Sequence, residues 1–404
     1  TWLPDSREQW RQVPAPVRIV TLLTIAVPLL QLVPLPPALW QALPGRDLQR
    51  EALALIDLDQ TWRPISLAPH RTLASLLSLL PPLLMLAMTS TLDRTARLRL
   101  VRVVLVVAIA ALLLGALQLT GGETSPAHLY DEVRAVLTGF QANRNSTADF
   151  LLVAMLSWPL LLRVLIEQRR VPDNRVLVLS LAGGGLALFA LGVVLTASRT
   201  GIVLVPVPMV ASLWLLRAWL QLERKYVLGA AVTLAVLALL ALLLVRANPT
   251  LAAVAGRFDF SGELRPQLWR DGLYAMQKYF PVGVGMGDFV PALLADERLE
   301  VVRPFLPNRA HNDYLELAVE AGAAGIAALG LSIWLVLREG WRAWRDPARN
   351  TAGLVLFAMS GLLVFGLHSA VDYPFRSMAM ACLGAVCAGL LMAPRSAADP
   401  GDVK

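Results

Sequence analysis

Apolar runs about as long as a bilayer is thick recur along this chain, separated by short polar connections. A membrane-spanning helix needs roughly 18 or more consecutive apolar residues. Ten stretches approach or exceed that length: 17–35, 72–91, 100–119, 147–166, 176–196, 201–220, 226–246, 313–337, 351–371 and 376–393. Only 16% of the residues are charged, whereas soluble domains carry about 25%. The sequence therefore predicts an all-α, polytopic transmembrane helix bundle that contacts the lipid bilayer.

The distribution of basic residues orients the bundle. With ten spans, the connections form two alternating sets. Among the short connections, the set that includes residues 92–102 and 163–175 carries more than twice as many Lys and Arg residues as the other set. Short basic connections stay in the cytoplasm. We therefore expect both ends of the chain inside the cell and the other connections outside.

This orientation places the unusual polar segments on the external side. They include the long loop 247–311, which divides the chain into N-terminal transmembrane helices (1–246) and a C-terminal part (312–404) containing transmembrane helices and a cytoplasmic tail. Within the loop, apolar residues at helical spacing over 266–280 predict an interfacial helix. A glycine-rich turn at 281–289 follows, where the backbone can approach a neighbour closely.

Arginines precede several expected helix starts on the external side. Arg144 lies before Ser146 and Asp149, which resemble a capping box for a helix that begins at 147. Arg199 precedes Thr200 and Gly201, and Arg265 precedes Pro266, a typical first helical residue. Free backbone N–H groups at helix starts favour anions, and guanidinium groups pair with phosphate oxygens. The pattern indicates an anion site, and Arg309 is a further candidate.

His311 and Asn312 stand at the start of the next apolar stretch. Asn312 or Asp313 can cap that helix, and an imidazole at a helix N-terminus is favoured in the neutral form that a general base requires. Asn312, Glu316 and Glu320 share one helix face. An ionisable group as deep as Glu320 is expected to face the protein interior, in a functional or a packing role.

His368 and Asp372 form a second polar pair, one helical turn apart and just before Pro374. Asp372 is expected to orient His368 or to pair with Arg376. The two cysteines, Cys382 and Cys387, lie in the last apolar run and predict free thiols in the membrane. No metal-ligand spacing is present, so neither a metal nor a cofactor is expected. Since the basic charge is explained by membrane sidedness, no nucleic-acid partner is expected either.

Several segments together resemble the bacterial O-antigen ligase and O-antigen (exopolysaccharide) polymerase family. HNDYLELAVEAG (311–322) resembles its His-Asn signature, LTASRTG (195–201) its Ser-Arg segment, and RPQLWRDGLYAMQKYFPVGVGMGDF (265–289) its loop motif. GFQANRNSTADFLL and HSAVDYPFR are similar to segments of members that make secreted polysaccharides. The similarities run in order from about residue 139 to 376.

The resemblance implies a metal-independent glycosyltransferase in the bacterial inner membrane, with its active site facing the periplasm. Its donor would be an undecaprenyl-pyrophosphate-linked glycan. The family's essential residues correspond to Arg199, Arg265 and His311. We expect substrate-binding roles for Asn143, Arg144, Asn145, Arg309, Asn312, Glu320, His368, Asp372 and Arg376. About twelve spans are usual in the family, which implies two more spans than the ten expected here.

Three acceptors fit this resemblance: the growing glycan on a second lipid carrier, a lipid A core sugar, and a protein hydroxyl. The Asn-Arg-Asn and His-Ser-x-x-Asp-x-Pro segments favour a polysaccharide polymerase slightly over a ligase. A multispan transporter is the alternative from another functional class. Transporters commonly show internal repeats or broken helices in matching halves, and the sequence predicts neither.

Overall fold

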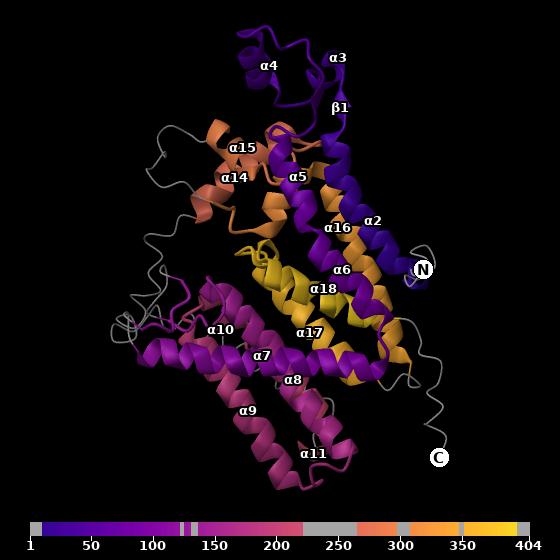
Figure 1. Cartoon of the computed structure of the whole chain (residues 1–404), viewed down its shortest axis with the longest axis vertical. Helices are drawn as coiled ribbons and strands as arrows, with labels where there is room; N and C mark the ends of the chain where they lie inside the picture. The colour runs from indigo at the N-terminus through magenta and orange to yellow at the C-terminus, as the bar shows by residue number, and fades with distance from the viewer. Residues whose placement is uncertain are drawn as a thin grey trace, which may run out of the picture.

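The computed structural model describes residues 10–121, 125–130, 136–220, 265–296, 308–346 and 351–393, and these are almost entirely helical (Figure 1). The first half contains α2 (Ala15–Leu32), α3 (Pro37–Trp40), α4 (Asp47–Ala54), α5 (Pro69–Ser78), α6 (Leu80–Thr91), α7 (Arg94–Thr120), α8 (Arg144–Glu167), α9 (Arg175–Leu195), α10 (Arg199–Leu204) and α11 (Pro206–Leu220). The second half contains α14 (Arg265–Tyr279), α15 (Phe289–Asp296), α16 (Asp313–Arg345), α17 (Ala352–His368), the short 3₁₀ helix η4 (Pro374–Arg376) and α18 (Met378–Met392). Two-residue strands β1 (Pro34–Leu35) and β2 (Arg63–Pro64) pair antiparallel.

The predicted helical bundle is confirmed, and nine of the ten expected spans fall on described helices. Seven helical segments are long and apolar enough to cross a membrane. The two expected spans nearest the C-terminus form shorter helices, α17 with 17 residues and α18 with 15. The remaining expected span, 226–246, lies outside the described residues, as do 247–264 and 297–307 of the long loop. The chain is therefore a multi-pass membrane protein.

Helix α8 is the centre of the bundle. It packs against α7, α9, α11 and α17. Its apolar stretch is 78% buried, compared with 17–39% for the other long spans. A helix that is apolar on all sides buries all sides, and the α8 sequence contains only one charged residue, Asp149, between its first turn and its last two turns. Asp149 is only 1% exposed and belongs to the site described below.

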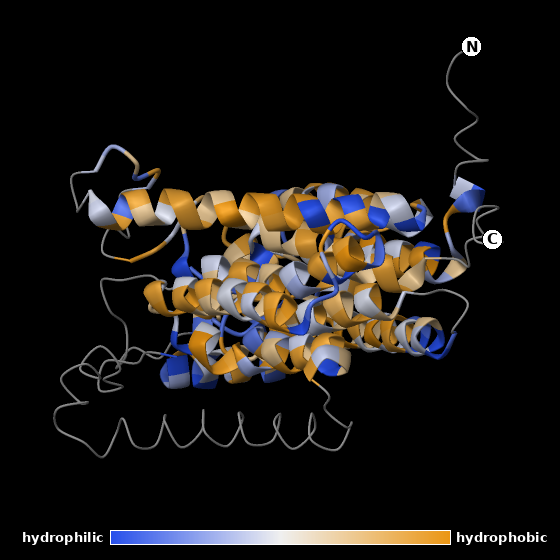
Figure 2. Ribbon diagram, turned by 90° about the horizontal axis from the view of Figure 1, so that it is seen from below, coloured by the Kyte–Doolittle hydropathy of each residue, from blue (hydrophilic) through white to orange (hydrophobic). Residues whose placement is uncertain are grey.

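Large apolar side chains cover the outside of the bundle, as a lipid-facing surface requires. On α7, Val103, Val106, Leu113 and Leu117 are each more than half exposed. In Figure 2, this helix is largely orange along the edge of the molecule. Transfer of such side chains into lipid supplies the apolar contact that a soluble protein would supply from its own core.

Polar residues set the helix starts. Asp93, Asn143, Asn174, Ser198 and Asn312 each accept a backbone N–H of the helix that follows. Such caps satisfy N–H groups that have no partner within the helix. The prediction that a helix begins at 147 is wrong by three residues, because the cap is Asn143 and α8 begins at Arg144.

Helix α16 contains a break that the sequence does not predict. At Gly322 the backbone adopts φ 55° and ψ −146°, which is not helical, so the helix consists of a short head (313–321) and a long shaft (323–345). The glycine-rich turn fills the break: Val284 N donates to Val319 O at 3.1 Å, and Ala323 N donates to Pro281 O at 2.8 Å. These tertiary bonds replace helical bonds lost at the break, as burial requires.

Candidate functional site

The starts of α8, α10 and α14, the head of α16 and the end of α17 lie on the same side of the molecule (Figure 1). Hydrogen bonds join two of these elements directly. The backbone N–H of Asp313 donates to Ser369 O at 2.9 Å, and the Ser369 hydroxyl donates to Asp313 Oδ2 at 3.0 Å. The segment 369–376, between α17 and α18, is thereby held against the head of α16. Most of the residues expected at the site occur on these elements.

His311 lies immediately before Asn312, the cap of α16, as the sequence predicts. Asn312 Oδ1 accepts the N–H of Leu315 at 3.0 Å. The backbone of His311 has a φ of 49°, in the left-handed region that residues with side chains seldom adopt. Its imidazole is 31% exposed and lies edge-on to the Tyr373 ring, with centroids 4.8 Å apart. The ring is thus fixed in place but remains accessible from one side.

Asp372, expected to orient His368, is instead hydrogen-bonded to His311. Its Oδ1 lies 3.0 Å from His311 Nδ1, and its Oδ2 accepts a hydrogen bond from the Asn145 amide at the start of α8. When Nδ1–H donates to a carboxylate, the lone pair of the neutral ring is on Nε2. Burial alone would raise the pKa of Asp372, but the His311 hydrogen bond and the His368 charge lower its pKa below the usual value. The pair combines an ionised carboxylate with a ring nitrogen able to accept a proton.

His368 has a partner that the sequence did not reveal. Its Nδ1 lies 2.6 Å from Asp149 Oδ1, and both side chains are 1% exposed. Its Nε2 is 3.8 Å from Asp372 Oδ2, beyond hydrogen-bond distance. The capping-box role expected for Asp149 is wrong, because the cap of α8 is Asn143, three residues before Ser146. The Asp149 carboxylate instead binds His368, 219 positions later in the chain.

Three of the four arginines expected at helix starts are found there. Arg144 begins α8, Arg199 begins α10 and Arg265 begins α14. Helix α10 packs against both α8 and α17, and Ser198 caps it by accepting Gly201 N–H at 3.2 Å. Helix α14, which begins at Arg265, packs against α16. These positive charges gather around the His311 end of the bundle.

Arg309 and Arg376 are held by carboxylates of α16. Arg309 lies 2.9 Å from Glu316, whereas Arg376 lies 2.7 Å from Glu320 and 3.3 Å from Glu316. The alternative pairing of Arg376 with Asp372 is therefore wrong. Glu320 faces the protein interior as predicted, with no exposed surface, and so does Glu316. This network fixes the α16 head to the loop before it and the segment after α17.

The glycine-rich turn supports the α16 head from the opposite side. Its three glycines at 283, 285 and 287 all have positive φ. A Cβ at Gly283 would lie 2.5 Å from Glu320 O, so the expected close backbone approach is confirmed. Asp288 follows the turn and accepts hydrogen bonds from Ser66 Oγ at 2.8 Å and Ala68 N at 2.9 Å. Burial raises the pKa of Asp288 to about 6.

The interfacial helix expected over 266–280 is present as α14, although part of its apolar stripe faces protein. Leu268, Trp269 and Met276 pack in a cluster with residues of α15 and α16. Leu273 and Phe280 are 45% and 48% exposed and are the members of the stripe available to a membrane surface. Placement of α14 in the headgroup plane stays a prediction.

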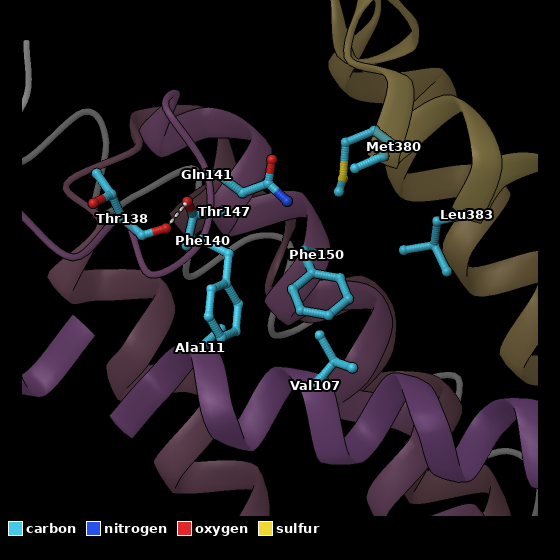
Figure 3. Close-up of a pocket in the computed structure, with 10 residues that line it drawn as sticks. Val107, Ala111, Thr138, Phe140, Gln141, Thr147, Phe150, Met380 and Leu383 are labelled. Atoms are coloured by element: carbon cyan, nitrogen blue, oxygen red, sulfur yellow. Dashed lines mark hydrogen bonds between the residues drawn. The ribbon is translucent and has the colours of Figure 1, made fainter. Parts of the chain in front are cut away.

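An apolar cleft lies beside the start of α8 (Figure 3). It encloses about 150 Å³ between α7, α8, the loop before α8 and the start of α18. In Figure 3, Gln141 and Phe150 face Met380 and Leu383 across the gap, and Thr147 is hydrogen-bonded to the Thr138 carbonyl at the polar end. The cleft lining includes Thr147, which lies on α8 two residues after Asn145 and two residues before Asp149. An apolar surface therefore adjoins the polar site, and none of its lining residues was predicted.

The remaining expected residues divide between structural and site positions. The Asn143 side chain is used as the cap of α8, whereas Asn145 reaches Asp372. Cys382 and Cys387 are free thiols, as expected. Among the described residues, no group of three or more His, Cys, Asp and Glu side chains is placed to hold a metal ion. Metal independence stays a prediction.

Comparison with protein families gives a match to the family described as O-antigen ligase, over residues 184–330. Comparison with curated proteins gives no match. The matched range contains α10, α14, the glycine-rich turn, the head of α16 and the residues just before that head, and so includes Arg199, Arg265, His311 and Glu320. The match supports the resemblance inferred from the sequence motifs: residues 184–330 of this multi-pass membrane protein are similar to the O-antigen ligase family.

Proposed function

We propose that this protein transfers a glycan from an undecaprenyl-pyrophosphate-linked donor to a sugar hydroxyl at the periplasmic face of the bacterial inner membrane. The observation that carries this proposal is the His311–Asp372 pair beside the α16 head, with arginines at three helix starts on the same side of the molecule. Similarity to the O-antigen ligase family supports a glycosyltransferase-like reaction.

In the proposed reaction, the acceptor hydroxyl attacks the anomeric carbon of the donor sugar. His311 Nε2 takes the hydroxyl proton, while Asp372 holds Nδ1–H and stabilises the imidazolium that forms. The bond between the anomeric carbon and the pyrophosphate oxygen breaks, and undecaprenyl pyrophosphate leaves with the bonding electrons. Arg199, Arg265 and Arg144 offset the charge on that leaving group.

Other predicted site residues receive supporting roles in this proposal. Asn145 holds Asp372, and Asn312 caps the α16 head. Arg309, Glu320 and Arg376 act as positioning residues because their ion pairs fix that head. The isoprenoid chain of the donor lies in the apolar cleft. An engineered cavity of about 150 Å³ holds benzene, so this cleft has room for about one five-carbon isoprenyl unit.

A polysaccharide polymerase is the form of this activity that we favour. The two segments that resemble polysaccharide-forming members, at 139–152 and 368–376, contact each other through Asn145–Asp372 and Asp149–His368. Because side chains of both segments meet in one group of hydrogen bonds, the two segments are expected to share one role in the reaction. Transfer to a lipid A core sugar or to a protein hydroxyl is the alternative within the family.

The test is transfer by the full chain in lipid nanodiscs, with a defined lipid-linked oligosaccharide as donor. A second lipid-linked glycan, a lipid A core and a Ser/Thr peptide are offered separately as acceptors. His311→Ala should abolish transfer, whereas His70→Ala, which replaces an exposed histidine on α5, should retain it. Arg199→Lys should reduce transfer at least 100-fold, roughly 3 kcal/mol, because a point charge lacks the bidentate fork.

Activity of a folded His311→Ala protein would remove His311 from the mechanism. Full activity of Arg199→Lys would argue against a bidentate phosphate contact, and Arg50→Lys on α4 is its matched control. Transfer should also persist in EDTA, and strict dependence on an added metal would contradict the proposed chemistry. Uptake of a glycan into vesicles without bond formation would instead indicate a transporter.

A further inference from the structure

His368 occupies an unusual position for an ionisable side chain, because it is buried between two carboxylates. Its side chain is 1% exposed at the end of α17. Nδ1 lies 2.6 Å from Asp149 Oδ1 on α8, and Nε2 lies 3.8 Å from Asp372 Oδ2. Asp372 in turn binds His311 Nδ1 through its other oxygen. Carboxylates and imidazoles therefore alternate from Asp149 to His311.

The geometry indicates which protons His368 carries. Within the part of the chain that the structure describes, His368 Nε2 has no hydrogen-bond partner, and neither has Asp149 Oδ2. A separation of 3.8 Å leaves no room for a water between Nε2 and Asp372. A neutral ring would direct a lone pair at one of the two carboxylates, whereas an imidazolium directs an N–H at each.

We propose that Asp149 holds His368 as an imidazolium, and that this charge partly neutralises Asp372 and so weakens the proton affinity of His311. The inference rests on the proposed function, in which His311 is the base. His368 is a positioning residue in this arrangement, since it acts through Asp372. Its role is to limit the negative charge beside His311, the group that accepts the proton.

Other charges around His368 do not replace this contribution. Arg265 of α14 is the one further cation whose charge acts on His368 in the described part of the chain. At the α16 head, Asp313 accepts hydrogen bonds from Ser369 and Phe375, and on η4 Arg376 is paired with Glu320 and Glu316. Arg199 of α10 and Arg144 of α8 lie at the same end of the bundle.

The charge balance gives the direction of the effect. With His368 charged, the group of Asp149, His368 and Asp372 carries one uncompensated negative charge, which His311 neutralises when it takes a proton. Without the His368 charge, the same group carries two negative charges beside His311. A stronger negative field makes the imidazole hold its proton to higher pH, where it can no longer act as the base.

The experiment is the pH dependence of glycan transfer by the full chain in nanodiscs, with saturating lipid-linked donor. His368→Gln removes the charge and keeps a polar side chain. It should move the acidic limb of the pH–rate profile to higher pH, by on the order of one pH unit. His368→Lys keeps a positive charge between the carboxylates and should leave the limb near its original pH.

A purely structural role for His368 would lower activity equally at every pH and leave the limb unmoved. That result in folded His368→Gln protein overturns the inference. If this variant does not fold, the double variant Asp149→Asn/His368→Gln removes both buried partners together, and it should shift the limb in the same direction by a smaller amount. Retained activity of His311→Ala, by contrast, overturns the proposed function itself.

Discussion

At the scale of single residues, this site is made of charges that are buried because each has a partner distant in the chain. Breaking a buried ion pair by removing one partner typically costs about 3–5 kcal/mol, since the other charge is left unpaired. Glu320 with Arg376 and Asp149 with His368 are such pairs. Asp288 differs, because its partners are the neutral donors Ser66 and Ala68, and its Oδ1 has no hydrogen-bond partner among the described residues.

Asp288 should make the protein less stable as the pH rises. Burial raises its pKa in the folded protein to about 6, from an ordinary value of 3.8. The folded state therefore keeps a proton that the unfolded state loses between about pH 4 and pH 6. Stability falls through that window and is constant above it. Asp288→Asn should remove this decline and raise stability at pH 7 by about 2–3 kcal/mol.

The measurement is the thermal unfolding midpoint in detergent at pH 4.5 and pH 7. The difference between the two midpoints should narrow in Asp288→Asn relative to the parent protein. Asp57→Asn, which changes an exposed carboxylate, is the matched control and should behave like the parent. An unchanged difference in Asp288→Asn would show that this carboxyl is ionised in the folded protein.

Local sequence signals single out the candidate residues better than they reveal the partners of those side chains. His311 was predictable because its signal is local: a histidine and an asparagine directly before a long apolar run. Asp149 was assigned instead to its own helix start, since Ser146 lies three residues before it. Nothing local distinguishes a capping carboxylate from one that binds His368, 219 positions away. That choice is decided by how α8 and α17 pack.

At the scale of elements, the apolar cleft beside α8 can be closed without changing the site itself. Ala379 lines the cleft from α18, and its side chain is exposed. Ala379→Trp should fill the cleft and raise the KM for a long-chain polyprenyl donor roughly tenfold. A tenfold change corresponds to about 1.4 kcal/mol, or about two buried methylene groups. The turnover number at saturation should change little.

Met378→Trp is the matched control, because Met378 precedes Ala379 on α18, is 44% exposed and does not line the cleft. Steady-state transfer kinetics with donors carrying full-length and two-unit isoprenoid chains provide the comparison. The effect of Ala379→Trp should be largest with the long chain. An equal KM for both variants would exclude the cleft as the lipid path.

Elements themselves were predicted well where periodicity is strong and poorly where tertiary contacts intervene. The span at 313–337 was correctly expected, but its break was not, because Gly322 lies in a stretch of small residues that an intact helix also accommodates. The break depends on the glycine-rich turn, whose backbone pairs with Val319 and Ala323. A glycine alone does not specify such a partner.

At the scale of the whole molecule, the charge asymmetry of the connections predicts opposite accessibility for two exposed positions. Leu55→Cys places a thiol after α4, where the parent side chain is 87% exposed, and Arg170→Cys places one between α8 and α9. In cells with a permeabilised outer membrane, a membrane-impermeant maleimide should label the first variant. The second should react only after the inner membrane is opened. The reverse pattern would place His311 on the cytoplasmic side.

Overall architecture was the easiest property to obtain from sequence, since an apolar chain in lipid has few alternatives to helices that bond their own backbones. Ten apolar runs and their flanking arginines sufficed for a multi-pass bundle. The arrangement of helices around α8 was not predictable, because α8 differs little from α9 or α7 in composition. Only their packing reveals that α8 carries one half of the site.

The break in α16 makes α2 a partner of the candidate site. The Gln31 amide nitrogen donates to Glu320 O at 2.8 Å, and its oxygen accepts Met286 N–H at 2.9 Å. The Gln31 side chain at the end of α2 thus contacts both the head of α16 and the glycine-rich turn. A change of the Gln31 side chain is therefore expected to disturb the α16 head, although Gln31 and Glu320 lie 289 positions apart in the chain.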